Sequence, residues 1–215
     1  MPRELADLPY ARFLEAFEGE LEPDSDYESA HIDGLDLDEL DGRGVRFTQS
    51  ALTTIQFNGG TFRYGRFDDV WLRAVRWIGT NLGQSGWLNS EFVECALSGV
   101  EAVGAGLRRI RFEGCKFDSV NLRNASLQDV TFSDCVLRDT DLGEATLRRV
   151  CFPGTRLDGI TLHNASLHDV DLRGATTLDL TAGIDSLRGA TVSTPQLLDL
   201  APAFARAAGI TVRDN

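Results

Sequence analysis

The sequence predicts an all-β solenoid, a rod in which the chain winds through four short sides in every coil. Three features carry this prediction: a large apolar residue at every fifth position, a small or β-branched residue two places before it, and a turn-forming residue two places after it. Neither an α-helix nor a plain β-strand has this period, because helical side chains recur every turn of about 3.6 residues and strand side chains simply alternate. A long run of five-residue units is therefore a repeat architecture that decides the whole fold.

The large apolar series begins at Phe47 and ends at Leu172. Of its 26 positions, 25 hold Leu, Phe or Trp, and Ala102 is the exception. We expect these side chains to fill the interior of the rod. Around Ala102 the sequence loses bulk and gains glycine, so we predict the thinnest part of the rod there and a site for a bulge.

The other two series define the rest of each unit. The small series runs from Val45 to Val170, and all 26 members are Gly, Ala, Ser, Cys, Thr, Val or Ile, which fit a crowded inward position. The turn series runs from Gln49 to Gly174, and more than half of its members are Gly, Asn or Asp, which accept a positive φ. Each unit thus reads as two inward side chains followed by a tight turn.

Identities within the small series set the number of units in a coil. Alanine recurs at every fourth unit, and so does cysteine, at Ala105, Ala125, Ala145 and Ala165 and at Cys95, Cys115 and Cys135. This spacing predicts four units per coil and a four-sided rod. Residues 45–174 then make about 6.5 coils, roughly 30 Å long at a strand spacing of ~4.8 Å.

The cysteines and the absence of catalytic patterns bear on chemistry. We expect Cys95, Cys115 and Cys135 to form a buried ladder of free thiols, since stacked parallel side chains have poor disulfide geometry. Cys151 falls at an outward position and is predicted to be an exposed thiol. No phosphate-binding loop, nucleophile–base pair or metal-ligand set stands out. We therefore expect no enzyme, no cofactor, no metal and no small-molecule substrate.

Acidic residues concentrate at the N-terminus. Residues 1–42 hold 14 Asp and Glu against two Arg, whereas residues 43–215 hold 19 acidic and 19 basic residues. The first stretch is either a solvated lead-in or an anionic arm that docks on a basic protein surface. The formal charge of −12 argues against direct binding of nucleic acid. Candidate anionic partner-binding residues are Glu18, Glu20, Glu22, Asp24, Asp26, Glu28, Asp139, Asp141 and Glu144.

The sequence also carries signals about compartment and source. No run of 18 apolar residues exists, so no membrane span is expected. No apolar segment follows basic residues at the N-terminus, so no secretory signal is expected and the protein is predicted to be cytoplasmic. Of 21 basic residues only Lys116 is a lysine, a bias typical of a GC-rich bacterial genome.

Both ends of the rod are predicted to be helical. After Pro9, four apolar residues at i, i+3, i+4 and i+7 predict an amphipathic helix that caps the rod, namely Tyr10, Phe13, Leu14 and Phe17. We therefore divide the chain into an acidic N-terminal segment with this cap (1–42), the repeat region (43–192) and a C-terminal helical dimerisation tail (193–215).

The C-terminal tail has clear helix boundaries. Thr194 is the predicted N-cap, Pro195 occupies the first helical position and Gly209 stops the helix. Pro202 should kink the helix or split it into two. The apolar side chains of the tail either cap the rod or also form the interface of a homodimer: Leu197, Leu198, Leu200, Phe204, Ile210 and Val212.

The five-residue motif resembles that of the pentapeptide repeat family. It reads small–polar–Leu/Phe–polar–Gly, as in residues 125–129 and 170–174, and the resemblance spans about 130 of the 215 residues. It implies a right-handed quadrilateral β-helix. One branch of this family binds type II topoisomerases, chiefly DNA gyrase, as a dimeric rod that mimics duplex DNA and protects the enzyme from fluoroquinolones or other gyrase poisons.

The unbroken phase and the helical tail are most similar to the MfpA type of this branch rather than to the loop-bearing Qnr type. The resemblance implies a homodimeric, non-enzymatic protein that binds DNA gyrase and modulates or protects it. The balanced charge of residues 43–215 departs from the pattern of a DNA mimic. The alternatives are therefore a protein-interaction scaffold with a different partner and a self-resistance protein of an antibiotic cluster.

Overall fold

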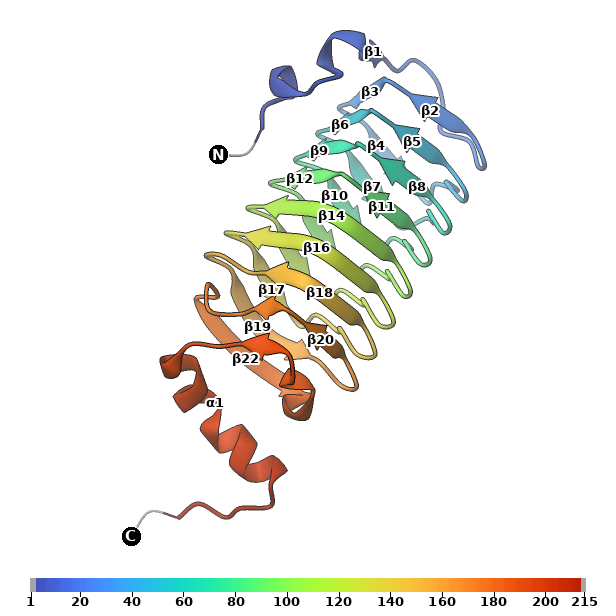
Figure 1. The fold of residues 1–215 in the computed structure, drawn as a ribbon. Coiled ribbons are helices and arrows are strands. Elements are labelled where there is room, and N and C mark those ends of the chain that lie inside the picture. Colours follow the sequence, from blue (N-terminus) through green and yellow to red (C-terminus); the bar gives the residue numbers. More distant parts are fainter. Residues whose placement is uncertain (1–2, 214–215) are drawn as a thin grey trace.

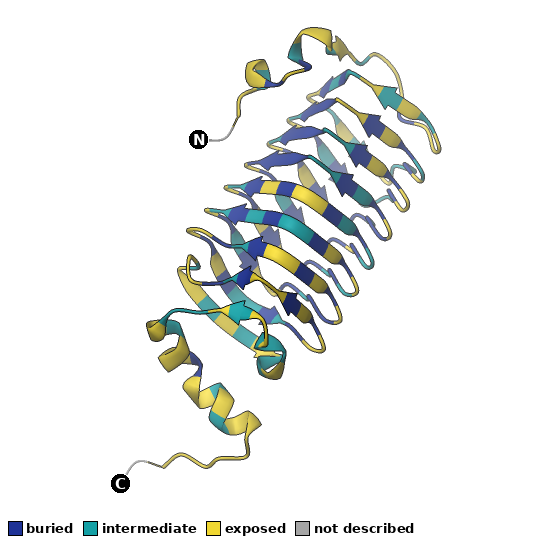
Figure 2. Ribbon diagram, in the orientation of Figure 1, coloured by how far each residue is buried: buried dark blue, intermediate teal, exposed yellow. Residues whose placement is uncertain are grey.

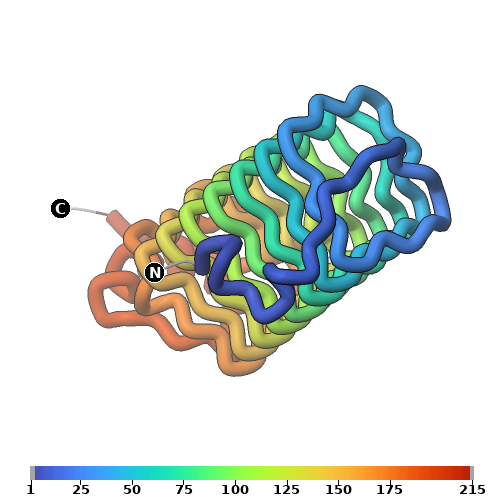
Figure 3. The backbone as a smooth tube through the Cα atoms, turned by 90° about the horizontal axis from the view of Figure 1, so that it is seen from above, coloured from blue at the N-terminus to red at the C-terminus, as the bar shows by residue number. Residues whose placement is uncertain are grey.

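The computed structural model describes residues 3–213 and shows a four-sided β-solenoid (Figure 1). The chain makes about eight coils of parallel strands, and one helix follows the last coil. Each coil pairs with the coils before and after it, so that Arg46 lies beside both Asp26 and Arg66. These partners are four units apart, so the predicted number of units per coil is confirmed. Seen from above, the coils stack into a straight tube (Figure 3).

The rod has four sides, which we call faces A to D in chain order. Strands form faces A, B and C. Face A holds β2 (Asp26–Glu28), β5 (Arg46–Thr48), β8 (Arg66–Asp68), β11 (Gly86–Leu88) and β20 (Ser166–His168). Face B holds β1 (Glu15–Ala16), β3 (Ala30–Asp33), β6 (Ala51–Thr53), β9 (Trp71–Arg73), β12 (Glu91–Val93), β21 (Val170–Asp171) and β23 (Ala190–Thr191). Three longer strands run through the corner between these two faces: β14 (Gly106–Glu113), β16 (Ser126–Ser133) and β18 (Thr146–Cys151).

Face C is a second sheet, and face D is held by single bridges. Face C holds β4 (Asp36–Asp38), β7 (Gln56–Asn58), β10 (Arg76–Ile78), β13 (Ala96–Ser98), β15 (Lys116–Asp118), β17 (Val136–Arg138), β19 (Arg156–Thr161) and β22 (Thr177–Ala182). On face D, one residue per coil bridges its counterparts in the adjacent coils: Asp41, Thr61, Asn81, Glu101, Asn121, Asp141 and Thr161. Several of these side chains accept a hydrogen bond from the backbone two positions on, which holds the turn.

The interior contains the predicted apolar series. Every member from Phe47 to Leu172 is buried, and the small series lines the corners beside it (Figure 2). Aromatic rings stack from coil to coil, as where Phe132 lies between Phe112 and Phe152 with centroids 4.8 and 5.1 Å away. Because each ring is buried by the coils above and below it, the coils stabilise one another.

The turns follow the predicted series. Every fifth residue from Asp24 to Asp169 has a positive φ, whether it is glycine or not. Gly174 is the exception, because no left-handed φ occurs there. One extra residue enters the chain just after it, so that Thr177 rather than Thr176 pairs with Arg156. The regular phase thus ends where the C-terminal end of the rod begins.

The predicted bulge at Ala102 is wrong. Glu101 bridges both Asn81 and Asn121, so the register passes through this coil without a shift. The missing bulk instead leaves an internal apolar cavity of about 30 Å³, lined by Ala102 among other residues. The hydrogen bonds of the coil fix the backbone, so a small side chain leaves a void rather than a bend.

The rod begins earlier than residue 43. The register reaches back to Asp26, and Tyr27 and Ile32 continue the inward series. The sequence pattern is hidden at Gly42, which has no side chain at the inward position. The ring of Phe62 fills that place and lies 2.6 Å from where a Cβ of Gly42 would stand. The acidic residues before 43 therefore belong largely to the first coil rather than to a separate arm.

The predicted N-terminal amphipathic helix is also wrong. Two short 3-10 turns occur instead, η1 (Leu5–Asp7) and η2 (Ala11–Phe13), followed by β1. Glu15 and Ala16, near the end of the expected helix, pair instead with Ala30 and His31 as β1, and Tyr10 is buried against face B. Residues 3–14, which we call the N-terminal strap, lie along face B (Figure 3). The end of the core is covered by Phe17 and Leu21.

The C-terminal helix α1 (Thr194–Ala207) follows the short turn η3 (Ile184–Leu187). Its N-cap is Ser193, one residue before the expected Thr194, because the Ser193 hydroxyl and the Gln196 side chain form a reciprocal capping box. The helix passes through Pro202 without a break, so the expected split is wrong; Pro202 is exposed. Gly209 ends the helix with φ +71°.

Candidate interaction surfaces

The N-terminal coils form an acidic end of the rod. The predicted residues Glu18, Glu20, Glu22, Asp24, Asp26 and Glu28 are all exposed in the loop and strand that begin the first coil. Asp26 pairs with Arg46 at 2.9 Å. Nearby on face D, the Arg43 guanidinium lowers the pKa of the Asp41 carboxyl by hydrogen bonding. Acidic residues outnumber these arginines, so this end carries most of the negative charge of the chain.

The second predicted acidic group is not a free patch. Arg123 lies between Asp141 and Glu144 on face D and pairs with both carboxylates. Asp139 is exposed at the turn that leads onto this face, with a φ of 48°. Since one cation is shared by two of the three carboxylates, this group keeps less net negative charge than the N-terminal coils and is a weaker anionic surface.

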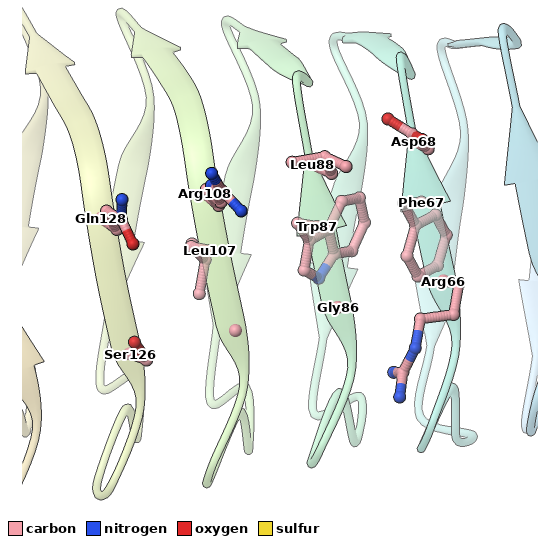
Figure 4. A pocket seen from close by; sticks show the side chains of 11 residues that line it. Arg66, Phe67, Asp68, Gly86, Trp87, Leu88, Leu107, Arg108, Ser126 and Gln128 are labelled. Atoms are coloured by element: carbon pink, nitrogen blue, oxygen red, sulfur yellow. The ribbon is translucent and has the colours of Figure 1, made fainter.

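A shallow groove on face A was not foreseen from the sequence (Figure 4). Gly86, Gly106 and Ser126 share one outward position in three successive coils; the middle is open at Gly106, and the Arg66 side chain lies over Gly86. Arg66 and Arg108 lie at its sides, and the groove encloses about 370 Å³. The signal in the sequence was this run of small residues four units apart, which becomes visible only when the units are sorted by face.

The chemistry of the face A groove suits an acidic partner. One Arg66 nitrogen donates to the carbonyl oxygens of Tyr64, Gly65 and Gln84, which fixes the side chain at the groove edge. The lining is largely apolar, with Leu88 among its residues, and its charged side chains are two arginines against one carboxylate, that of Asp68. An apolar surface flanked by guanidinium groups favours a segment that carries carboxylates beside apolar side chains.

Face C has a wider depression. It encloses about 550 Å³ beside the small side chains of Ala96 and Ser98. Arg76 and Lys116 lie at the same outward position two coils apart, and Ile78 is 42% exposed beside them. Like the groove on face A, this surface combines cations with apolar area.

The predicted tail interface divides into a buried and an exposed part. Leu200 is buried and Gln196 donates to the carbonyl oxygens of Leu172 and Ala175, so this side of α1 docks on the last coil. The other apolar residues of the predicted interface are 37% to 73% exposed: Leu197, Leu198, Phe204, Ile210 and Val212. The start of α1 thus docks on the last coil, and the rest of the tail is largely exposed (Figure 2), with the apolar side chains named above among the exposed ones.

The cysteines divide by burial. Cys95, Cys115 and Cys135 are buried free thiols whose sulfurs point to backbone carbonyl oxygens, as the sequence predicts. Burial raises the pKa of the Cys115 thiol, which keeps it protonated and inert. Cys151 is only half-buried and touches the Thr131 hydroxyl at 3.4 Å, so it is less open than the predicted exposed thiol.

Within residues 3–213, no three His, Cys, Asp or Glu side chains gather in a way that could hold a metal ion. None of the helices there combines the length and apolar character needed to cross a membrane.

Comparison with known proteins places the repeats in one class. Residues 85–162 match the family described as a pentapeptide repeat region. Residues 85–162 are thus similar to the pentapeptide repeat family, and the structure shows them as coils of a parallel-strand β-solenoid. No curated protein matches the sequence.

Several solved structures are similar at low identity. A trypsin-treated form of QnrB1, a plasmid-mediated fluoroquinolone resistance protein, is 17% identical, with 87% of this chain and 99% of that chain covered and a TM-score of 0.42. AT2G44920, a pentapeptide repeat protein of the Arabidopsis thaliana thylakoid lumen, is 11% identical over 58% of this chain and 76% of that chain, with a TM-score of 0.44. HetL of Nostoc sp. strain PCC 7120 is 17% identical over 79% and 90%, with a TM-score of 0.31.

Proposed function

We propose that this protein is a homodimeric binding rod without enzyme activity that docks on DNA gyrase and modulates it or protects it from quinolones or other gyrase poisons. The observation that carries the proposal is the unbroken register of the coils followed by a helical apolar tail. The sequence resemblance to the gyrase-binding branch of the pentapeptide repeat family rests on the same two features. The cytoplasm is the compartment that this proposal requires.

The exposed apolar part of the tail supports a homodimer. An apolar helix side that projects from a rod is unfavourable in water unless a partner covers it. A second copy supplies an identical surface, and a two-fold axis through the tails would join two rods end to end. Replacing Leu197 and Leu198 by glutamate should yield a monomer on a calibrated sizing column. An unchanged elution volume would show that these residues do not form a dimer interface.

The charge distribution selects the surface that faces gyrase. The coils beyond residue 42 have balanced charge, so they do not resemble the uniform anionic field of duplex DNA. The acidic N-terminal coils supply the anionic contact instead, and in the proposed dimer they lie at the two distal ends. Complementary charge at such ends would steer the rod onto a basic surface and make the association sensitive to salt.

A supercoiling assay with purified gyrase tests the proposal, with and without ciprofloxacin. We expect the protein at micromolar concentration to inhibit supercoiling or to reduce drug-stabilised DNA cleavage. A variant with Gln at 18, 20 and 22 should lose much of this effect, because it removes exposed charge from the acidic end. The matched control, Asp118→Asn/Asp169→Asn/Asp185→Asn, removes three exposed charges away from that end. If the unaltered protein neither inhibits supercoiling nor protects gyrase from the drug, the proposal is excluded.

The neutral charge of the rod favours a second candidate, a scaffold for a different protein. The two candidates are separated by affinity capture from a lysate of the native organism. Recovery of gyrase subunits, reduced by about 1 M salt, supports the gyrase partner. A different stoichiometric protein in place of gyrase supports the scaffold. A self-resistance role would require the same gyrase contact.

A further inference from the structure

The strap covers apolar side chains that have no reason to be on the outside of a solenoid. Ala51, Trp71 and Val93 occupy outward positions of face B in three successive coils, and each is at most 2% exposed. Outward positions of these strands are otherwise mostly polar. These three residues, which we call the face B strip, form one apolar cluster under the strap, in which Ala51 and Trp71 share a position and Val93 lies in the next coil beside Arg73.

The strap is attached through side chains. Leu8 and Tyr10 are buried against the strip, and Leu5, Ala11 and Leu14 pack around them. The backbone hydrogen bonds within residues 3–14 are local, such as that from the Ala11 N–H to the Leu8 carbonyl oxygen. Within the described residues, no backbone bond joins this segment to the rod before Glu15. A segment held in this way opens at far lower free energy than the coils.

A buried carboxylate lies at the far end of the strip. Glu91 is 1% exposed and its Oε2 accepts a hydrogen bond of 2.7 Å from Nε of Arg3. Its Oε1 has no partner among the described residues. A buried carboxylate is costly unless a cation satisfies it. The end of the strip is thus built to receive a positively charged side chain, and a second ion pair joins Glu4 to Arg73 beside it.

We infer that the face B strip with Glu91 is a peptide-binding site, which the strap fills in the closed molecule and a partner protein's segment of the same chemistry can fill in its place. The bound segment has an arginine for Glu91 and apolar residues two, five and seven places later. In the strap these are Arg3, Leu5, Leu8 and Tyr10. The site is independent of the proposed gyrase contact, since it lies on a side face rather than at the acidic end or the tail.

Binding of a strap peptide in trans tests this site in the full chain. The probe is a fluorescein-labelled peptide of residues 1–16, measured by fluorescence anisotropy. The receptor is the full-length variant Arg3→Ala/Leu8→Ala, whose own strap is weakened. We expect about tenfold tighter peptide binding to this variant than to the unaltered protein, since the strap no longer competes. Trp71 emission should shift to the red in the free variant and return when peptide binds.

Matched variants show whether the peptide occupies the strip. Adding Trp71→Ala or Glu91→Gln to the weakened-strap variant should reduce peptide affinity about tenfold or more. Ile78→Ala on face C is the control and should leave it unchanged. A peptide with glutamate at its third position should bind as weakly as the unaltered peptide binds to the Glu91→Gln variant. If any variant loses its circular dichroism signal, Leu5→Ala/Leu8→Ala provides the second weakened strap.

Three outcomes would overturn the inference. The first is equal peptide affinity for the unaltered and weakened-strap proteins. The second is peptide binding that survives Trp71→Ala. The third is a protein with an unaltered strap that doubles in mass while its tail carries Leu197→Glu and Leu198→Glu, because the occupant would then be a second copy's strap rather than a partner segment.

Discussion

The stack of aromatic rings on face B makes a quantitative prediction about the core. Phe132 is 1% exposed, and its ring is nearly parallel to those of Phe112 and Phe152, with interplanar angles of 9° and 4°. Phe132→Ala removes a buried ring and two stacking contacts, and the coils on either side cannot close the gap without breaking their register. The expected loss is roughly 3–5 kcal/mol of unfolding free energy.

The assay is thermal unfolding followed by circular dichroism. For a domain of this size the loss corresponds to a fall in Tm of roughly 6–20 °C. Phe132→Leu is the matched control, because Leu occupies this position in many other units, and it should cost only about 1 kcal/mol. If the Tm of Phe132→Ala lies within about 2 °C of that of the unaltered protein, the ring is not held between two coils, and Phe132→Asp should then also retain a cooperative melt.

Two other properties can be checked in the same way. Thr54 has a φ of 54°, which is strained for a β-branched residue. Thr54→Gly should therefore raise the unfolding free energy by about 1 kcal/mol, whereas the control Thr53→Gly should lower it. A lower unfolding free energy in both variants would exclude relief of strain. Burial, Asp69 and Glu91 raise the pKa of Tyr10, and Arg3 opposes them. The docked strap therefore favours the protonated phenol. The contribution of Tyr10 to the docking free energy is fully present below pH of about 10 and is lost as pH rises above it. Trp71 emission should then shift to the red, and Tyr10→Phe should abolish the shift.

Most of the rod could be predicted from the sequence because its coils are nearly identical. Each unit repeats the same local chemistry, and the recurrence of Ala105 and Cys95 four units later was enough to fix the register that the structure shows. The first coil was missed at Gly42, where the inward side chain is absent and Phe62 from the next coil replaces it. A pattern read along the chain cannot show that a side chain from the next coil fills the place left empty by a glycine.

The candidate surfaces were harder to predict, since they depend on which residues share a face. Residues 10–17 were assigned to a helix because their apolar spacing fits one, yet Tyr10 is buried against Trp71, which is three coils further along the chain. Trp71 falls outside the inward series, which was the available signal that something covers it. The face A groove likewise depends on Gly86 and Gly106 lying side by side.

A repeat of four units per coil underlies every surface described above, and spin-label distances measure it directly. In a Cys151→Ser background, labels replace the exposed Arg156 together with either Arg76 or Asp36, all at the same outward position of face C. The labels should lie four coils apart in the 76/156 pair and six coils apart in the 36/156 pair. At ~4.8 Å per coil, the backbone distances are about 19 and 29 Å. A difference of about 10 Å between the two pairs, equal to two coils, agrees with the stacked rod. Equal distances, or a second distance shorter than the first, would contradict it.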